Sequence, residues 1–172
     1  MAEHLSSVVR AATAGPTGTA WVSALPCRRR PGHRPCPGHI AVSRPDLPAR
    51  IEWRCTSCGD EGVISGWEGS PYDLHRPGSE PARRADVQVL IPDEVAATLR
   101  RLDLLDTDCE RLVFRARATS EGIVLDTNAE DLDELVGYVA ANANHEENRR
   151  RQKGMDVAFD VLNDALKDLP EV

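Results

Sequence analysis

Short apolar runs bounded by turn residues predict a small β-rich unit in the first third of the chain. Trp21–Leu25 is one such run, and residues 51–54 and 62–67 form a further pair around a tight bend. Prolines and glycines crowd residues 28–39, which forbids regular structure there and predicts a loop. We therefore expect a β module over residues 21–68.

The segments on either side of this module have weaker patterns. Residues 1–20 are rich in alanine, threonine, glycine and serine, and predict a flexible tail or loosely docked cap with at most a short helix from His4 to Ala12. Residues 69–85 hold three prolines and no apolar period, which predicts a linker. A second domain then occupies residues 86–172.

In this second domain the spacing of apolar residues changes along the chain, which predicts both strands and helices. A strand is expected at 87–91 and a helix at 93–104, where apolar residues recur on one face. Residues 112–116 alternate between apolar and mostly polar side chains, which predicts a strand that turns at 119–122 and returns through 123–125.

Two helices complete the pattern. Thr127 with Glu130 three residues later predicts a capping box that starts the first of them. The order is then β-α-β-β-α-α, and the fold class is α+β. The last helix has an apolar seam that either packs back on its own domain or forms a dimer interface. The seam consists of Met155, Phe159, Leu162, Leu166 and Leu169.

Charge is distributed unevenly along the chain. Residues 1–60 contain eight arginines against four carboxylates, a net of +4, so the remainder carries −11 of the total of −7. A basic module can approach polyanions, whereas an acidic one mainly keeps the chain soluble. The use of 19 arginines and only two lysines indicates a GC-rich bacterial genome. Without a long apolar run or a signal peptide, we expect a cytoplasmic protein that does not enter membranes.

Cysteine spacing carries the strongest chemical signal. Four of the five cysteines lie between Cys27 and Cys58, and a reducing cytoplasm favours a metal site over disulfides. Cys109 stands apart and is expected to be a small buried apolar residue.

The pair Cys55 and Cys58 has the spacing of a metal knuckle. Two intervening residues let both thiolates reach one tetrahedral ion, and Gly59 tolerates the positive φ that follows. The stretch IEWRCTSCGDEGVISGW resembles the second hairpin of zinc-ribbon proteins, in which such a knuckle joins two antiparallel strands. The resemblance implies a structural zinc ion.

The second half of the site has two possible compositions. Cys36 is one ligand, and either Cys27 or His39 is the other, since Cys36-Pro-Gly-His39 also has a two-residue gap. Four thiolates form the commonest closed structural site, which favours Cys27.

Arginines gather around this module and suggest a function. A concentrated positive surface attracts phosphate backbones, so the leading hypothesis is nucleic-acid binding. The alternative is an interaction or regulatory subunit that acts through its C-terminal helices, as a homodimer or with another protein. The sequence has no Gly-rich phosphate loop and no GxSxG elbow, so an enzyme ranks third. The candidate nucleic-acid contacts are Arg28, Arg29, Arg30, Arg34 and Arg54.

Two further groups invite a functional interpretation. Trp21, Trp53 and Trp67 could stack on bases, but so small a module needs them in its core. The polar stretch 144–151 predicts either a hydrated link between two helices or a patch that binds phosphate or a partner.

Overall fold

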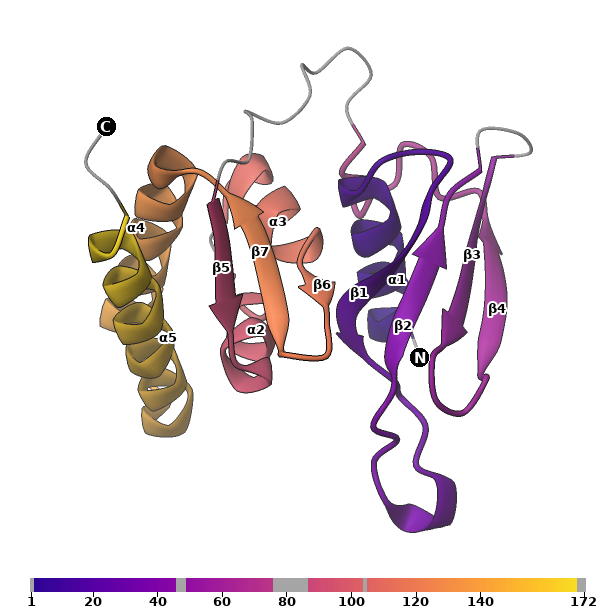
Figure 1. The fold of residues 1–172 in the computed structure, drawn as a ribbon, viewed down its shortest axis with the longest axis horizontal. Helices are drawn as coiled ribbons and strands as arrows, with labels where there is room; N and C mark the ends of the chain where they lie inside the picture. Colours follow the sequence, from indigo (N-terminus) through magenta and orange to yellow (C-terminus); the bar gives the residue numbers. More distant parts are fainter. Residues whose placement is uncertain (1, 46–48, 76–86, 104, 170–172) are drawn as a thin grey trace.

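The computed structural model describes residues 2–45, 49–75, 87–103 and 105–169. A seven-stranded antiparallel sheet in the order β4-β3-β2-β1-β6-β7-β5 runs through it, with α1, α2 and α3 behind the sheet in the view of Figure 1. The predicted α+β class is confirmed. The elements are α1 (Ala2–Ala14), β1 (Ala20–Pro26), the 3-10 helix η1 (Pro31–His33), β2 (His39–Ser43), β3 (Arg50–Cys55), β4 (Glu61–Ser65), β5 (Val87–Ile91), α2 (Asp93–Leu99), α3 (Thr107–Phe114), β6 (Arg117–Ala118), β7 (Ile123–Thr127), α4 (Ala129–His145) and α5 (Arg149–Lys167).

The hairpin expected at the metal knuckle is present as β3 and β4. Its register runs from Arg50 opposite Ser65 to Arg54 opposite Glu61. Side chains alternate between the two faces, so Trp53 is buried on the side that α1 covers whereas Arg54 is exposed. This alternation fixes which side chains of the hairpin can reach solvent.

The N-terminal segment differs from the expected tail or loose cap, because α1 is a docked helix of 13 residues. Val8 and Ala11 are fully buried, and Thr13 Oγ1 accepts a hydrogen bond from the Leu74 backbone N–H at 2.9 Å. Small side chains let the helix approach the sheet closely. At the end of the helix, a Cβ on Gly15 would lie 2.7 Å from the Trp21 indole nitrogen.

The prediction of a strand at 112–116 is wrong, because residues 107–114 form the helix α3. The Asp106 side chain caps this helix by accepting a hydrogen bond from the Cys109 N–H at 2.7 Å. Cys109 and Leu112 then lie on its buried face, as a helical period requires. The strand begins only at Arg117, and the turn at 119–122 is confirmed by a bond from Thr119 N to Gly122 O.

Helix boundaries in this half also shift. α2 ends at Leu99, five residues before the predicted end at residue 104, which lies outside the described residues. α4 is capped by Asn128 rather than Thr127, because the Asn128 side chain accepts from Asp131 N. Among the described helices, none has the length and apolar character that a membrane crossing needs.

The apolar seam of α5 packs within the chain, against α4 and α2. Leu162 is fully buried and Met155 nearly so, while Phe159, Leu166 and Leu169 lie partly buried against the same core. The seam is therefore used for folding, and a partner at the C-terminal helices stays a prediction.

The two halves meet along β1 and β6. Ser23 lies opposite Arg117, and Ala24 N donates to Ala116 O at 2.9 Å. An ion pair of 2.9 Å joins Arg10 on α1 to Glu110 on α3. Most of the predicted linker, residues 76–85, lies outside the described residues, so the two-domain division stays a prediction.

Candidate metal centre

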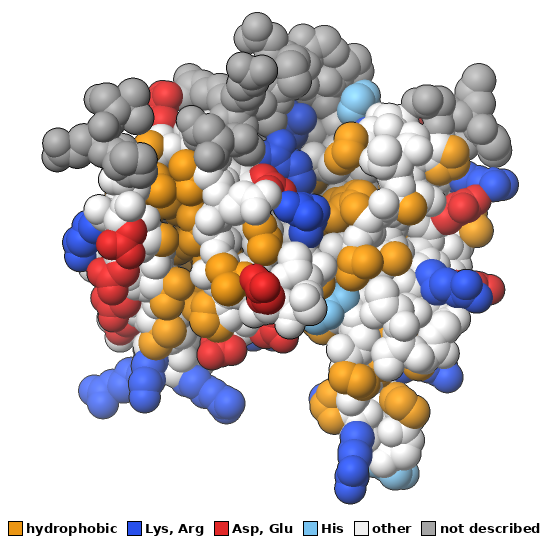
Figure 2. All heavy atoms as spheres, viewed as in Figure 1, with side chains coloured by type: hydrophobic (Ala, Val, Ile, Leu, Met, Phe, Trp, Pro, Cys, Tyr) orange, Lys and Arg blue, Asp and Glu red, His pale blue; other side chains and the backbone are white. Residues whose placement is uncertain are grey.

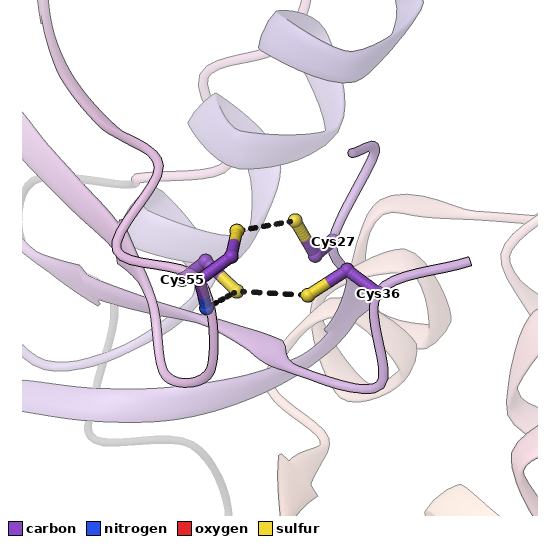
Figure 3. Close-up of side chains that lie close together, drawn as sticks. Cys27, Cys36 and Cys55 are labelled. Atoms are coloured by element: carbon purple, nitrogen blue, oxygen red, sulfur yellow. Dashed lines mark hydrogen bonds between the residues drawn. The ribbon is translucent and has the colours of Figure 1, made fainter. Parts of the chain in front are cut away.

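Four cysteine thiols converge at one end of the N-terminal half of the sheet. Cys27 follows β1, Cys36 precedes β2, Cys55 ends β3, and Cys58 lies in the turn to β4. Their sulfur atoms all lie within 4.8 Å of one another. Figure 3 shows the labelled side chains of Cys27, Cys36 and Cys55 pointing toward a common centre from separate segments.

The distances within the cluster suit four ligands of one ion. Cys27 Sγ lies 3.6 Å from Cys58 Sγ, and Cys36 Sγ lies 3.7 Å from Cys55 Sγ. Zinc–sulfur bonds of about 2.3 Å in a tetrahedron place sulfurs roughly 3.8 Å apart, so little movement separates this arrangement from a bound one. Cys27, Cys36 and Cys55 are buried and only Cys58 is exposed, which closes the cluster on its inner side.

Backbone N–H groups prepare the knuckle for negative charge. The N–H groups of Ser57 and Cys58 both donate to Cys55 Sγ, at 3.4 and 3.5 Å. Burial opposes ionisation of Cys55, but these two donors, together with hydrogen bonds from the Cys27 and Cys58 thiols, bring the pKa of its thiol down to about 7. Gly59 takes the positive φ of 70° that the sequence predicts at the end of the knuckle.

Burial opposes ionisation of a second thiol in the cluster. Burial raises the pKa of the Cys27 thiol to about 12, and hydrogen bonds with the other three thiols contribute in the same direction. A bound divalent ion removes this obstacle and keeps all four sulfurs deprotonated. The four cysteines are therefore a group that could hold a metal ion.

The structure brings Cys27 into the cluster and leaves His39 out. Ile40 lies opposite Cys55 in the β2–β3 pair, so His39, one residue earlier, projects from the other face of the sheet. Its imidazole borders a groove of about 570 Å³ that the 119–122 turn also lines. Among the described residues, the four-ligand group consists of the cysteines alone.

Gly38 is a residue of this site that the cysteine pattern did not reveal. A Cβ at this position would lie 2.6 Å from Cys55 Sγ and 2.8 Å from the Ser57 backbone nitrogen. Its carbonyl accepts a hydrogen bond from Cys27 N at 2.8 Å. Gly38 thus lets the two loops approach closely enough for their sulfurs to meet.

The five candidate nucleic-acid arginines fall into two groups. Arg28 pairs with Asp60 at 3.3 Å and lies over the Trp53 ring, and Arg54 pairs with Glu61 at 3.1 Å. The other three lie further along the loop between Cys27 and Cys36 (residues 28–35), which begins with Arg28 and which we call the basic finger. All its residues are exposed, and it projects from the rest of the chain (Figure 1). These three are Arg29, Arg30 and Arg34.

The tryptophans serve mainly as core residues. Trp53 and Trp67 are buried, and Trp21 is partly buried against the same core. Arg44 is also buried and lies over the Trp67 ring, where it donates to Thr17 Oγ1 at 2.7 Å. Stacking on bases by Trp53 or Trp67 would require the core to open.

His4 packs α1 against Trp53 of β3. Its ring contacts Trp53 edge to face at 5.6 Å, and its Nε2 is buried with no hydrogen-bond partner in the described part of the chain. Burial lowers the pKa of His4 below the model-peptide value of 6.5, and the nearby Arg28 lowers it further.

Acidification is expected to weaken the docking of α1 through His4. The unfolded chain binds a proton more readily than the folded one, so this residue costs stability as the pH falls through about 6.5. His4→Phe keeps the ring packing without titrating. Urea denaturation at pH 7 and pH 5 should therefore show a smaller loss of stability in His4→Phe than in the wild type. An equal loss in both proteins would exclude His4 as a cause.

Comparison of the chain with protein-family models, with curated proteins and with solved structures gives no match.

Proposed function

We propose that this chain is a zinc-stabilised nucleic-acid-binding protein. Four thiolates in tetrahedral reach of one another are the donor set of a closed structural zinc site, because a soft ion without geometric preference suits sulfur ligands. In this proposal Cys27, Cys36, Cys55 and Cys58 hold the ion. The zinc then supplies folding energy and leaves no open position for chemistry.

The observation that carries nucleic-acid binding is the basic finger. Cys27 and Cys36 close the loop at its base, where Cys36 N donates to Arg29 O at 2.9 Å. No ion pair with a described residue is found for the side chains of Arg29, Arg30 or Arg34, in contrast to Arg28 and Arg54. Three exposed guanidinium groups on a clipped loop supply the sequence-independent contacts that phosphate backbones need.

A triple variant, Arg29→Ala, Arg30→Ala and Arg34→Ala, tests the proposal. Binding of a fluorescent 30-base-pair DNA duplex, followed by anisotropy between about 50 and 200 mM salt, should have a steep salt dependence in the wild type. In the variant, the slope of log K against log salt should be less steep by about 2 to 3, since each lost phosphate contact removes roughly 0.9 from its magnitude. Its zinc content should remain unchanged.

Arg50→Ala is the matched control. Arg50 is exposed on β3 of the same module but pairs with Glu52 at 2.6 Å, so its removal should leave the slope almost unchanged. No binding by the wild-type protein to DNA or RNA at low salt would refute the proposal. The alternative of an interaction or regulatory subunit would then take its place.

A further inference from the structure

Helix α5 has positive charges at its N-terminus, where the helix dipole makes them unfavourable. Its first turn contains Arg149, Arg150 and Arg151 and no acidic residue. A helix N-terminus is electrically positive, so cations there are destabilising and carboxylates are preferred. The exposed carboxylates lie further along at positions four residues apart: Asp156, Asp160 and Asp164 within α5, and Asp168 at its C-cap.

The basic end of α5 adjoins a second basic segment, the residues that follow α2. Arg101, Arg150 and Arg151 line a pocket of about 270 Å³, together with Asn148. Arg101 also lines a neighbouring pocket of about 430 Å³, in which Arg10 and Arg100 are accompanied by the carboxylates Glu3, Asp103 and Glu110. Guanidinium groups from three separate elements therefore border two adjoining hollows that share Arg101.

Pairing within the chain satisfies only part of this positive charge. Arg151 pairs with Glu146 at 2.9 Å and with Asp103 at 3.4 Å. No ion pair with a described residue is found for Arg101, Arg149 or Arg150, and Arg100 Nη1 is buried without a hydrogen-bond partner in the described part of the chain. Burial lowers the pKa of Arg100 to about 10, and the neighbouring charge of Arg101 adds to this shift.

The charges at the end of α5 and the basic finger project in the same direction. In Figure 1 the first turn of α5 and the finger both lie at the lower end of the molecule, on opposite halves. Figure 2 shows basic side chains at both places, with some acidic side chains on the face between them. A single extended polyanion could contact both.

We propose that Arg101, Arg149 and Arg150 form a second phosphate-contact site, which binds the backbone of the same nucleic acid as the finger. This inference rests on the proposed function. Phosphate oxygens would supply the negative charge that the first turn of α5 lacks, and the pocket beside Asn148 has room for a phosphate group.

The test is a triple variant, Arg101→Ala, Arg149→Ala and Arg150→Ala, assayed on the same 30-base-pair duplex in the full-length protein. We expect binding to weaken roughly tenfold or more at about 50 mM salt. The slope of log K against log salt should also become less steep by about 2 to 3. The corresponding triple lysine variant keeps the charges and should recover most of the affinity. Lys167→Ala, which removes a cation paired with Asp164 at the other end of α5, should have little effect.

Thermal unfolding without DNA separates binding from folding. The triple alanine variant should unfold at a higher temperature than the wild type, because unfavourable cations leave the start of α5. A variant that binds like the wild type while the finger variant is impaired would refute the second site and leave the proposed function intact. Loss of binding in this variant alone would instead assign the contact to α5 and refute the finger.

Discussion

Cys55→Ser is expected to abolish stoichiometric metal binding and to unfold the N-terminal half of the sheet. Cys55 is only 2% exposed. Its Sγ lies 3.7 Å from Cys36 Sγ and accepts hydrogen bonds from two backbone N–H groups. A serine hydroxyl stays protonated and binds zinc poorly. Structural zinc contributes on the order of 10 to 16 kcal/mol, as much as the whole stability of an ordinary domain, so the fold of this half should not survive its loss.

Elemental analysis of the purified proteins measures this directly. The wild type should contain about one zinc per chain, since the four thiols form a single site. Cys109→Ala is the matched control, because Cys109 is equally buried but belongs to α3, away from the cluster. It should keep its zinc. Full zinc content in Cys55→Ser would show that the cluster is not the metal site.

The extent of unfolding after zinc removal tests the predicted division into two domains. The C-terminal core, with Leu132, Leu135 and Leu162 fully buried, has no thiol of the cluster in it. Chelation followed by limited proteolysis should therefore leave a folded fragment that begins near residue 86. A single cooperative transition would mean instead that the contacts between β1 and β6 make one unit of the two halves.

Local chemistry made the knuckle predictable from the sequence. The spacing of Cys55, Cys58 and Gly59 determines backbone geometry within five residues, and short strands flank it on both sides. The choice between Cys27 and His39 as the fourth ligand depends on the register of the strands. A loop rich in proline and glycine does not reveal that register. Only the pairing of Ile40 with Cys55 shows that His39 points to the other face.

The predictions that differ from the structure also failed for physical reasons. Residues 109–116 contain apolar positions that fit both a period of two and a period of 3.6, and the Asp106 cap decides in favour of the helix. The alanines of α1 give a weak apolar signal, so the sequence does not predict a docked helix there, although their small size is what allows close packing. Pairing of Arg28 with Asp60 joins separate loops, so the sequence could not show which arginines are free of partners.

The close approach at Gly38 leads to a prediction about the metal site that does not alter any ligand. Gly38→Ala places a methyl group 2.6 Å from both Cys55 Sγ and Ser57 Cβ, and 2.8 Å from the Ser57 nitrogen. Backbone atoms cannot rotate away as a flexible side chain can, so the two loops must separate. Zinc affinity should fall by about 10- to 100-fold, the usual cost when the supports of a metal site are disturbed.

Competition with a chromophoric chelator at pH 7 measures this change. Gly137→Ala is the control, because a Cβ at this exposed position of α4 would meet nothing within 4 Å apart from its chain neighbours and the backbone of its own helix. That substitution should leave zinc affinity unchanged and raise the free energy of unfolding by about 0.4 to 1 kcal/mol, since alanine favours the helix. Equal zinc affinity in Gly38→Ala and the wild type would contradict the tight approach of the two loops. A loss confined to Gly38→Ala would show that the positions of the sulfurs depend on the space left by a residue that binds no metal itself.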